Sequence, residues 1–168
     1  MNAFFQSQFS YCPLIWMFHN RTLQNKINNL QERCLRLVYS DTVSSFEELL
    51  IRNNSQTLHQ RNLQSLATEL YKIKSHLSPN FLENIFTRQN LSINLRNQSD
   101  FKSRKIVKPL HGNESLSWLG PKIWNKTPLE IRNLDNLNEF KRQIRKIKFS
   151  TCPCRNCRQY LDGVGFIS

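Results

Sequence analysis

The longest helical repeat in the chain lies between Leu23 and Val38. Apolar side chains recur there at alternating steps of four and three residues, which places them along one stripe of an α-helix. The stripe consists of Leu23, Ile27, Leu30, Cys34 and Leu37, and the opposite face carries Gln24, Asn28, Gln31 and Arg36. We therefore predict that this helix turns its apolar stripe inward and that the rest of the chain packs on it.

The residues before this helix, from Phe4 to Phe18, are rich in aromatic side chains and almost uncharged. They predict one or two short helices, with Pro13 in the first turn of the second. Such a surface needs a partner. The pattern therefore indicates either an ordinary core helix or a face that packs on another part of a larger protein.

Capping signatures predict two further helices. Ser44 with Glu47 indicates a short helix that runs through Leu50, and Thr57 with Gln60 repeats the same signature. The second signature opens a long amphipathic helix that should end near residues 78–79. Its apolar stripe consists of Leu63, Leu66, Leu70, Ile73 and Leu77, and a short helix over 81–86 follows it.

The pattern changes after residue 88. Alternating apolar positions over 91–95, and less regularly over 105–110, predict two short extended segments. Helical spacing returns at Glu114 after a possible cap at Asn113, and Pro121 either kinks this helix or begins a new one. A break at 127–128 precedes a last helix, which Asn136 and Glu139 should cap.

The predicted fold is therefore mainly α. It comprises a helical bundle over 1–88, a mixed extended or loop segment over 89–112, a basic helical extension over 113–149 and a cysteine-containing tail over 150–168. Few glycines and prolines among 168 residues favour long helices with short polar loops over a β-sandwich.

Positive charge is concentrated in the second part of the chain. The net charge is +12, and residues 101–168 hold fourteen Lys or Arg against five Asp or Glu, which gives +9 there. A field of this sign attracts polyanions, above all nucleic acid, although a solvated basic face is the alternative. The candidate nucleic-acid-binding residues are Lys102, Arg104, Lys105, Lys108, Lys122, Lys141, Arg142, Arg145, Lys146 and Lys148.

Three cysteines near the C-terminus form a candidate zinc site. Cys152, Cys154 and Cys157 stand in a C-x-C-x2-C cluster, and arginines beside them favour the thiolate form. A structural zinc site takes four ligands, so Cys12, Cys34 or His111 would have to complete it through the fold. The alternative is three reduced thiols on the surface.

Other classes of site leave no signature. The chain shows no glycine-rich phosphate loop and no grouping of serine, histidine and acid, and its acidic residues are scattered apart from Glu47 and Glu48. We predict no catalytic residue. The run over 4–18 is too short and too polar for a signal peptide or a membrane span. We therefore expect an intracellular protein, in the cytoplasm or nucleus, without a membrane partner.

Eight segments, in this order and spacing, give the chain a family resemblance. They are FSYCPLIWMFHNR (9–21), INNLQERCLRLVY (27–39), FEELL (46–50), HQRNLQSLATELYKI (59–73), INLRN (93–97), GPKIWNKTPLEIR (120–132), LNEFKRQIRKIK (137–148), and CPCRNC followed by GF (152–166). Together they resemble the C-terminal region of reverse transcriptases encoded by LINE-type, jockey-like non-LTR retrotransposons.

The resemblance implies thumb-like helices and a C-terminal extension that help to hold the RNA template and primer duplex. The paired-aspartate motif of the palm is not in this chain, so the resemblance carries over no catalytic residue. It implies a truncated fragment of an RNA-directed DNA polymerase, whose partners are RNA or DNA and the missing upstream polymerase domain. Trp118, Trp124 and Tyr160 could stack on bases or, at helical spacing, belong to the core.

Two other functions fit the residues. One is a helical protein-interaction module that uses the surface over 4–18, and the other is a small zinc-dependent binding module built on the C-terminal cysteines.

Overall fold

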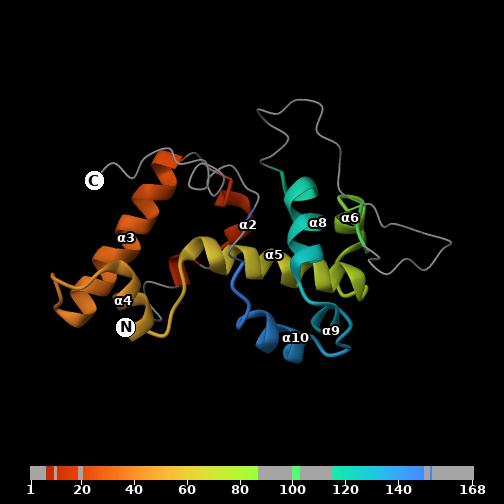
Figure 1. Cartoon of the computed structure of the whole chain (residues 1–168). Helices are drawn as coiled ribbons and strands as arrows, with labels where there is room; N and C mark the ends of the chain where they lie inside the picture. Colours follow the sequence, from red (N-terminus) through yellow and green to blue (C-terminus); the bar gives the residue numbers. More distant parts are fainter. Residues whose placement is uncertain are drawn as a thin grey trace. The chain divides into compact units, whose positions relative to one another are not determined.

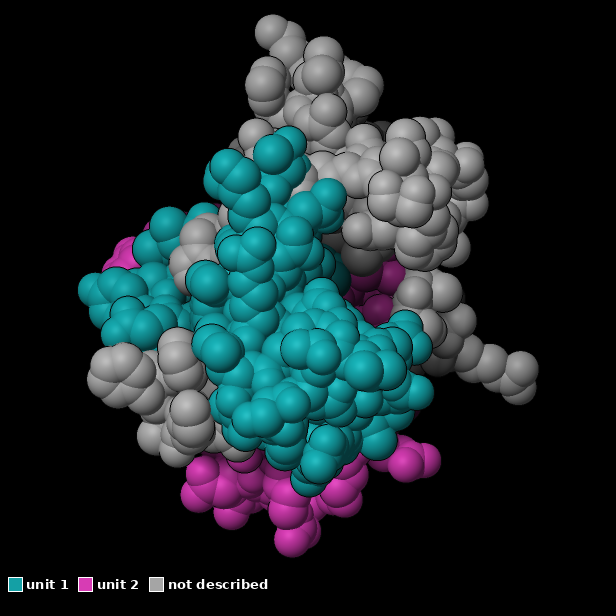
Figure 2. Space-filling model, turned by 90° about the vertical axis from the view of Figure 1, so that its left-hand side faces the viewer, with its two compact units in different colours: residues 1–62 teal, residues 63–168 magenta. Residues whose placement is uncertain are grey.

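The computed structural model describes residues 7–9, 11–18, 21–86, 100–102, 115–149 and 152 (Figure 1). Over these ranges the chain is mainly helical and contains no β-strand, which confirms the predicted α class. It divides into two compact units, residues 1–62 and 63–168, which Figure 2 shows in separate colours. The predicted extended segments over 91–110 lie largely outside the described residues, and so do the predicted domain boundaries near 88, 112 and 150.

The N-terminal unit contains α2 (Pro13–Trp16), α3 (Arg21–Tyr39) and α4 (Phe46–Arg52), together with the first residues of α5 (Leu58–Lys74). Pro13 opens α2, as predicted, because a proline in the first turn gives up no helical hydrogen bond. The small core of this unit joins Leu35 of α3 to Leu49 and Leu50 of α4, with Tyr39 and Phe46 packed at its edge.

Helix α3 forms where the repeat predicts it, but the predicted buried face is wrong. Leu30 and Leu37 are 50% and 71% exposed, whereas Gln31 is only 9% exposed. The Gln31 amide donates to the carbonyl of Gln56 (3.0 Å) and accepts from the backbone N–H of Leu58 (3.2 Å). Burial of an amide costs little once both of its ends are hydrogen-bonded. A glutamine therefore occupies the inner face, and among the described residues the leucines of the predicted stripe stay exposed.

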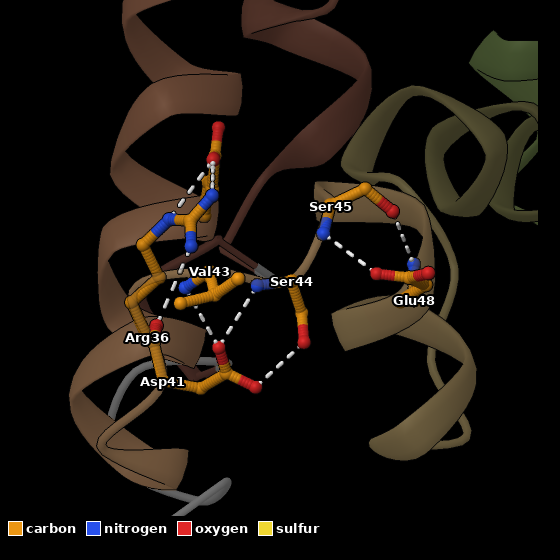
Figure 3. Close-up of polar contacts among 7 residues, drawn as sticks. Arg36, Asp41, Val43, Ser44, Ser45 and Glu48 are labelled. Carbon is orange, nitrogen blue, oxygen red and sulfur yellow. Dashed lines mark hydrogen bonds and ion pairs between the residues drawn. The ribbon is translucent and has the colours of Figure 1, made fainter.

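The turn between α3 and α4 is built on Asp41. Its carboxylate accepts from the backbone N–H groups of Val43 (3.0 Å) and Ser44 (2.9 Å) and from the Ser44 hydroxyl (2.7 Å) (Figure 3). Because Ser44 is held in this way, the capping box of α4 is formed by Ser45 and Glu48, one residue later than predicted.

The C-terminal unit contains most of α5 (Leu58–Lys74), together with α6 (Asn80–Glu83), α8 (Leu116–Lys126), α9 (Leu129–Arg132) and α10 (Leu137–Ile144). The predicted stripe of α5 is confirmed at its first four positions, since Leu63, Leu66, Leu70 and Ile73 are buried. The helix ends earlier than predicted, at Lys74.

A left-handed residue explains this early end. His76 has a φ of 55°, and its N–H bonds to the carbonyl of Ile73, while Leu77 N–H reaches the carbonyl of Lys72. This pattern is a Schellman C-cap, which closes the helix and turns the chain away. Leu77 is consequently exposed.

An aromatic cluster forms the centre of the C-terminal unit. Phe140 of α10 stacks on Tyr71 of α5 (ring centroids 4.3 Å apart) and on Trp124 of α8 (6.1 Å). Phe101 packs edge-on against Trp124 (5.7 Å) and Phe86 (6.0 Å). The larger core of the described chain therefore surrounds α5 and not α3. Its rings come from segments that are far apart in the sequence.

Helix α8 is one continuous helix that contains Pro121, so this proline does not begin a new one. Its N-cap is Ser115 and its first residue is Leu116, each two positions later than predicted. Gly120 lies so close to the Phe86 ring that an added Cβ would stand 2.6 Å from its Cε1 atom. A side chain at position 120 would therefore displace that ring.

Candidate nucleic-acid interface

Seven of the ten predicted nucleic-acid-binding residues lie within the described ranges. Five of them form one run, Lys141, Arg142, Arg145, Lys146 and Lys148, which we call the basic segment (141–148). Lys102 and Lys122 lie elsewhere in the unit, and Arg104, Lys105 and Lys108 lie outside the described residues.

The basic segment begins on α10 (Leu137–Ile144), which starts and is capped as predicted but ends before Arg145, whereas the sequence pattern predicted a helix that includes Ile147 and Lys148. The Asn136 side chain accepts hydrogen bonds from the N–H groups of Asn138 (2.8 Å) and Glu139 (3.4 Å), which caps the helix. Phe140 and Ile144 are buried, so the helix turns this face to the core. Amphipathic spacing therefore leaves the cations of α10 on its outer side.

Beyond α10 the segment is fixed through its backbone. The Gln64 amide of α5 donates to the carbonyls of Arg145 (3.2 Å) and Ile147 (3.0 Å). Phe149, at the end of this stretch, is buried. Lys146 and Lys148 are exposed between these anchor points. The chain thus presents charged side chains from a backbone that is attached to the core.

An acidic residue, Glu139, lies beside this row of cations. Glu139 pairs with Arg142 and accepts a hydrogen bond from Gln143 (2.6 Å). The hydrogen bond from the Arg142 side chain, with a further one from Gln143, lowers the pKa of Glu139, so it is charged at neutral pH. Because this ion pair is on the surface and screened by solvent, it leaves the segment strongly positive.

Lys122 is held differently. Its ammonium lies over the ring of Trp118, 3.9 Å from the centroid, in a cation–π contact. Trp118 and Trp124 are both buried in the core, so neither ring is available to stack on a base, and Tyr160 lies outside the described residues. Lys102 is exposed beside the buried Phe101.

Sequence reasoning missed a cluster of charges at one side of the core. The Asp100 carboxylate accepts from Trp124 Nε1 (2.6 Å) and lies near the cations of Lys74 (3.5 Å) and Arg132 (3.8 Å). Lys74 also donates to the carbonyl of Arg132 (3.1 Å) and to Asn133 Oδ1 (3.2 Å). These groups are far apart in sequence, so no local pattern reveals them. They tie α5, α8 and α9 to residues 100–102.

The cysteines give no assembled metal site within the described residues. Cys152 is buried, which is at odds with a surface thiol at this position, and Cys154 and Cys157 lie outside the described ranges. Among the side chains that are described, no three of the His, Cys, Asp and Glu type gather as a metal site would require. Zinc binding stays a prediction.

The aromatic surface over 4–18 is described only in part. Met17 is buried there, whereas Tyr11 and Ile15 are strongly exposed, and Phe4 and Phe5 lie outside the described residues. Some of this stretch therefore contributes to the core and some faces solvent.

Two findings bear on the class of protein. No helix in the described part of the chain combines the length and apolar character that crossing a bilayer requires. No protein-family model, curated protein or solved structure matches the chain.

Proposed function

We propose that this chain is the C-terminal region of a LINE-type, jockey-like reverse transcriptase and that it binds template–primer nucleic acid without a polymerase site of its own. The family origin rests on the sequence resemblance. The binding role rests on one structural observation, the row of exposed cations on the basic segment (141–148), whose backbone is bonded to α5.

These cations suit phosphates better than bases. Lysine and arginine side chains neutralise backbone phosphates regardless of sequence, whereas stacking on unpaired bases requires exposed aromatic rings. Phe140 and the two rings that it stacks on, Tyr71 and Trp124, are all buried. The proposed interface therefore binds the phosphate backbone and does not discriminate among base sequences.

Catalysis is outside the proposal. No catalytic residue is assigned, and the palm that performs nucleotide addition would be an upstream domain of a longer protein, which is also the proposed partner of this region. The thumb-like character of the helices and the location in the cytoplasm or nucleus belong to the same proposal.

A salt titration tests the binding role. Each phosphate contact contributes about −0.9 to the slope of log affinity against log salt, so four contacts give about −3.6 and a loss of about a hundredfold between 50 and 200 mM salt. The probe is a labelled RNA–DNA hybrid duplex, followed by fluorescence anisotropy. A slope near zero, or no binding at 50 mM salt, would contradict the proposal.

A pair of variants with equal net charge locates the interface. Lys146→Gln with Lys148→Gln should lower the magnitude of the slope by about 1.8. The matched control, Lys26→Gln with Arg33→Gln, removes two exposed cations of α3 and should leave the slope nearly unchanged. Equal losses in the two variants would show that the duplex responds only to total charge.

The family origin has its own test. The genomic DNA that precedes the first codon should continue the same reading frame into a polymerase motif with paired aspartates. Unrelated sequence there would leave the binding role to stand alone.

A further inference from the structure

Helix α3 presents a mixed apolar and basic face to solvent. Lys26, Leu30, Arg33 and Leu37 follow one another at steps of four, three and four residues, and all four are exposed; we call them the α3 outer face. The inner face of the same helix is occupied by Gln31 and Leu35. The outer face is therefore not used by the core of its own unit.

The apolar part of this face has the spacing of a helix-pairing seam. Leu30 and Leu37 are seven residues apart, with Cys34 half-buried between them. Ile27, three residues before Leu30, continues the same stripe toward the N-terminus. Leucines at heptad spacing form the contact line between paired helices. Exposed leucines in such a line, beside charged residues, are typical of a surface that receives an amphipathic helix.

The charges of the α3 outer face indicate which kind of partner helix it can bind. Lys26 and Arg33 each lie four residues before a leucine, so a cation adjoins each apolar contact. Glu32, the acidic residue of this helix, accepts hydrogen bonds of 3.0 and 2.6 Å from the Arg36 guanidinium. The outer face thus offers two cations that no acid of α3 neutralises.

We propose that the α3 outer face binds an acidic amphipathic helix of a partner protein, with apolar side chains at heptad spacing and Glu or Asp beside them. This proposal does not depend on the proposed nucleic-acid function. A second copy of the chain is a poorer occupant because its own α3 outer face carries the same two cations, while the acid of α3, Glu32, is already paired with Arg36, so a symmetric pair gains no charge complementarity.

Two synthetic helical peptides test the proposal with the full chain. Both have three heptads with leucine at the seam positions; one carries glutamate at the flanking positions and the other carries lysine. By fluorescence anisotropy, the acidic peptide should bind and the basic peptide should not. Equal binding of both peptides, or no binding of the acidic one, would overturn the proposal.

Leucine substitutions separate this contact from general attraction to a basic protein. Leu30→Ser with Leu37→Ser leaves the net charge unchanged and should weaken binding of the acidic peptide by about tenfold or more. The control Ile51→Ser removes a similarly exposed apolar side chain from α4 and should have no effect. Circular dichroism checks that each variant keeps its helices.

Charge reversal gives an independent result. Lys26→Glu with Arg33→Glu should transfer binding from the acidic to the basic peptide. Two outcomes would assign the face to another occupant: sedimentation that shows a dimer abolished by the leucine substitutions, or binding to anionic lipid vesicles that depends on the same leucines.

Discussion

Replacement of Phe140 by alanine should strongly destabilise the C-terminal unit. This side chain is fully buried and stacks on both Tyr71 and Trp124. Truncation of a buried phenylalanine to alanine costs about 3–5 kcal/mol of unfolding free energy. Each aromatic pair adds about 0.5–1.5 kcal/mol beyond buried area, so we expect a loss near the upper end of that range. The milder Phe140→Leu also loses both aromatic pairs but leaves a smaller cavity, and it should cost about 1–3 kcal/mol.

Urea denaturation, followed by tryptophan fluorescence, measures this loss, because Trp118 and Trp124 are buried in the same unit. The matched control is Phe81→Ala, since Phe81 is 67% exposed and its removal should change the free energy by less than about 0.5 kcal/mol. A loss below about 1 kcal/mol for Phe140→Ala, or equal losses in the two variants, would refute the assignment of this cluster as the core.

Three further predictions concern single contacts. The backbone N–H of Ser44, with the Ser44 hydroxyl and a neighbouring N–H, lowers the pKa of Asp41 from 3.8 to about 2. The folded pKa lies below the unfolded one, so Asp41 stabilises the fold above about pH 4 and this contribution is lost as the pH falls toward 2; an NMR titration that places Asp41 near 3.8 would contradict this. Gly120→Ala should cost about 1–3 kcal/mol in urea denaturation because the new Cβ meets the Phe86 ring, and Phe86→Leu in the same chain should recover part of the loss. Gln64→Ala should lower the free energy of unfolding by about 1–3 kcal/mol in thermal or urea denaturation, because two backbone carbonyls of the basic segment lose their donor. The same substitution should weaken duplex binding without removing a charge. Unchanged binding would show that this anchor is dispensable.

Local sequence was sufficient for the positions of the long helices, although it did not predict the short helix α9 (Leu129–Arg132). Periodicity placed α3, α5 and α10 correctly, and Asn136 caps α10 as its spacing indicates. Periodicity and capping depend on residues within a few positions of one another, so they are readable without the fold. Errors at the ends were of one to several residues, as at Ser45, where the bonds of the preceding turn decided which serine caps the helix.

The candidate interface was partly readable for the same reason. The basic segment (141–148) is contiguous, and Phe140 and Ile144 recur at helical spacing, so the outer side of its part on α10 follows from the sequence alone, whereas residues 145–148 are held by Gln64 of α5. Lys122 also appeared in the sequence as a candidate, but its contact with the Trp118 ring depends on how α8 is packed. The cluster around Asp100 had no signal, because its members meet only in the folded unit.

The sequence by itself determined that the chain is helical, where its long helices lie and where its positive charge is concentrated. Only the tertiary structure decided which face of α3 is buried. An apolar stripe is a local property, but Gln31 lies inside because its hydrogen-bond partners come from 56–58, more than twenty residues along the chain. The amide of a glutamine can be buried on the inner face because both of its ends are hydrogen-bonded. Those bonds depend on contacts that local sequence does not contain.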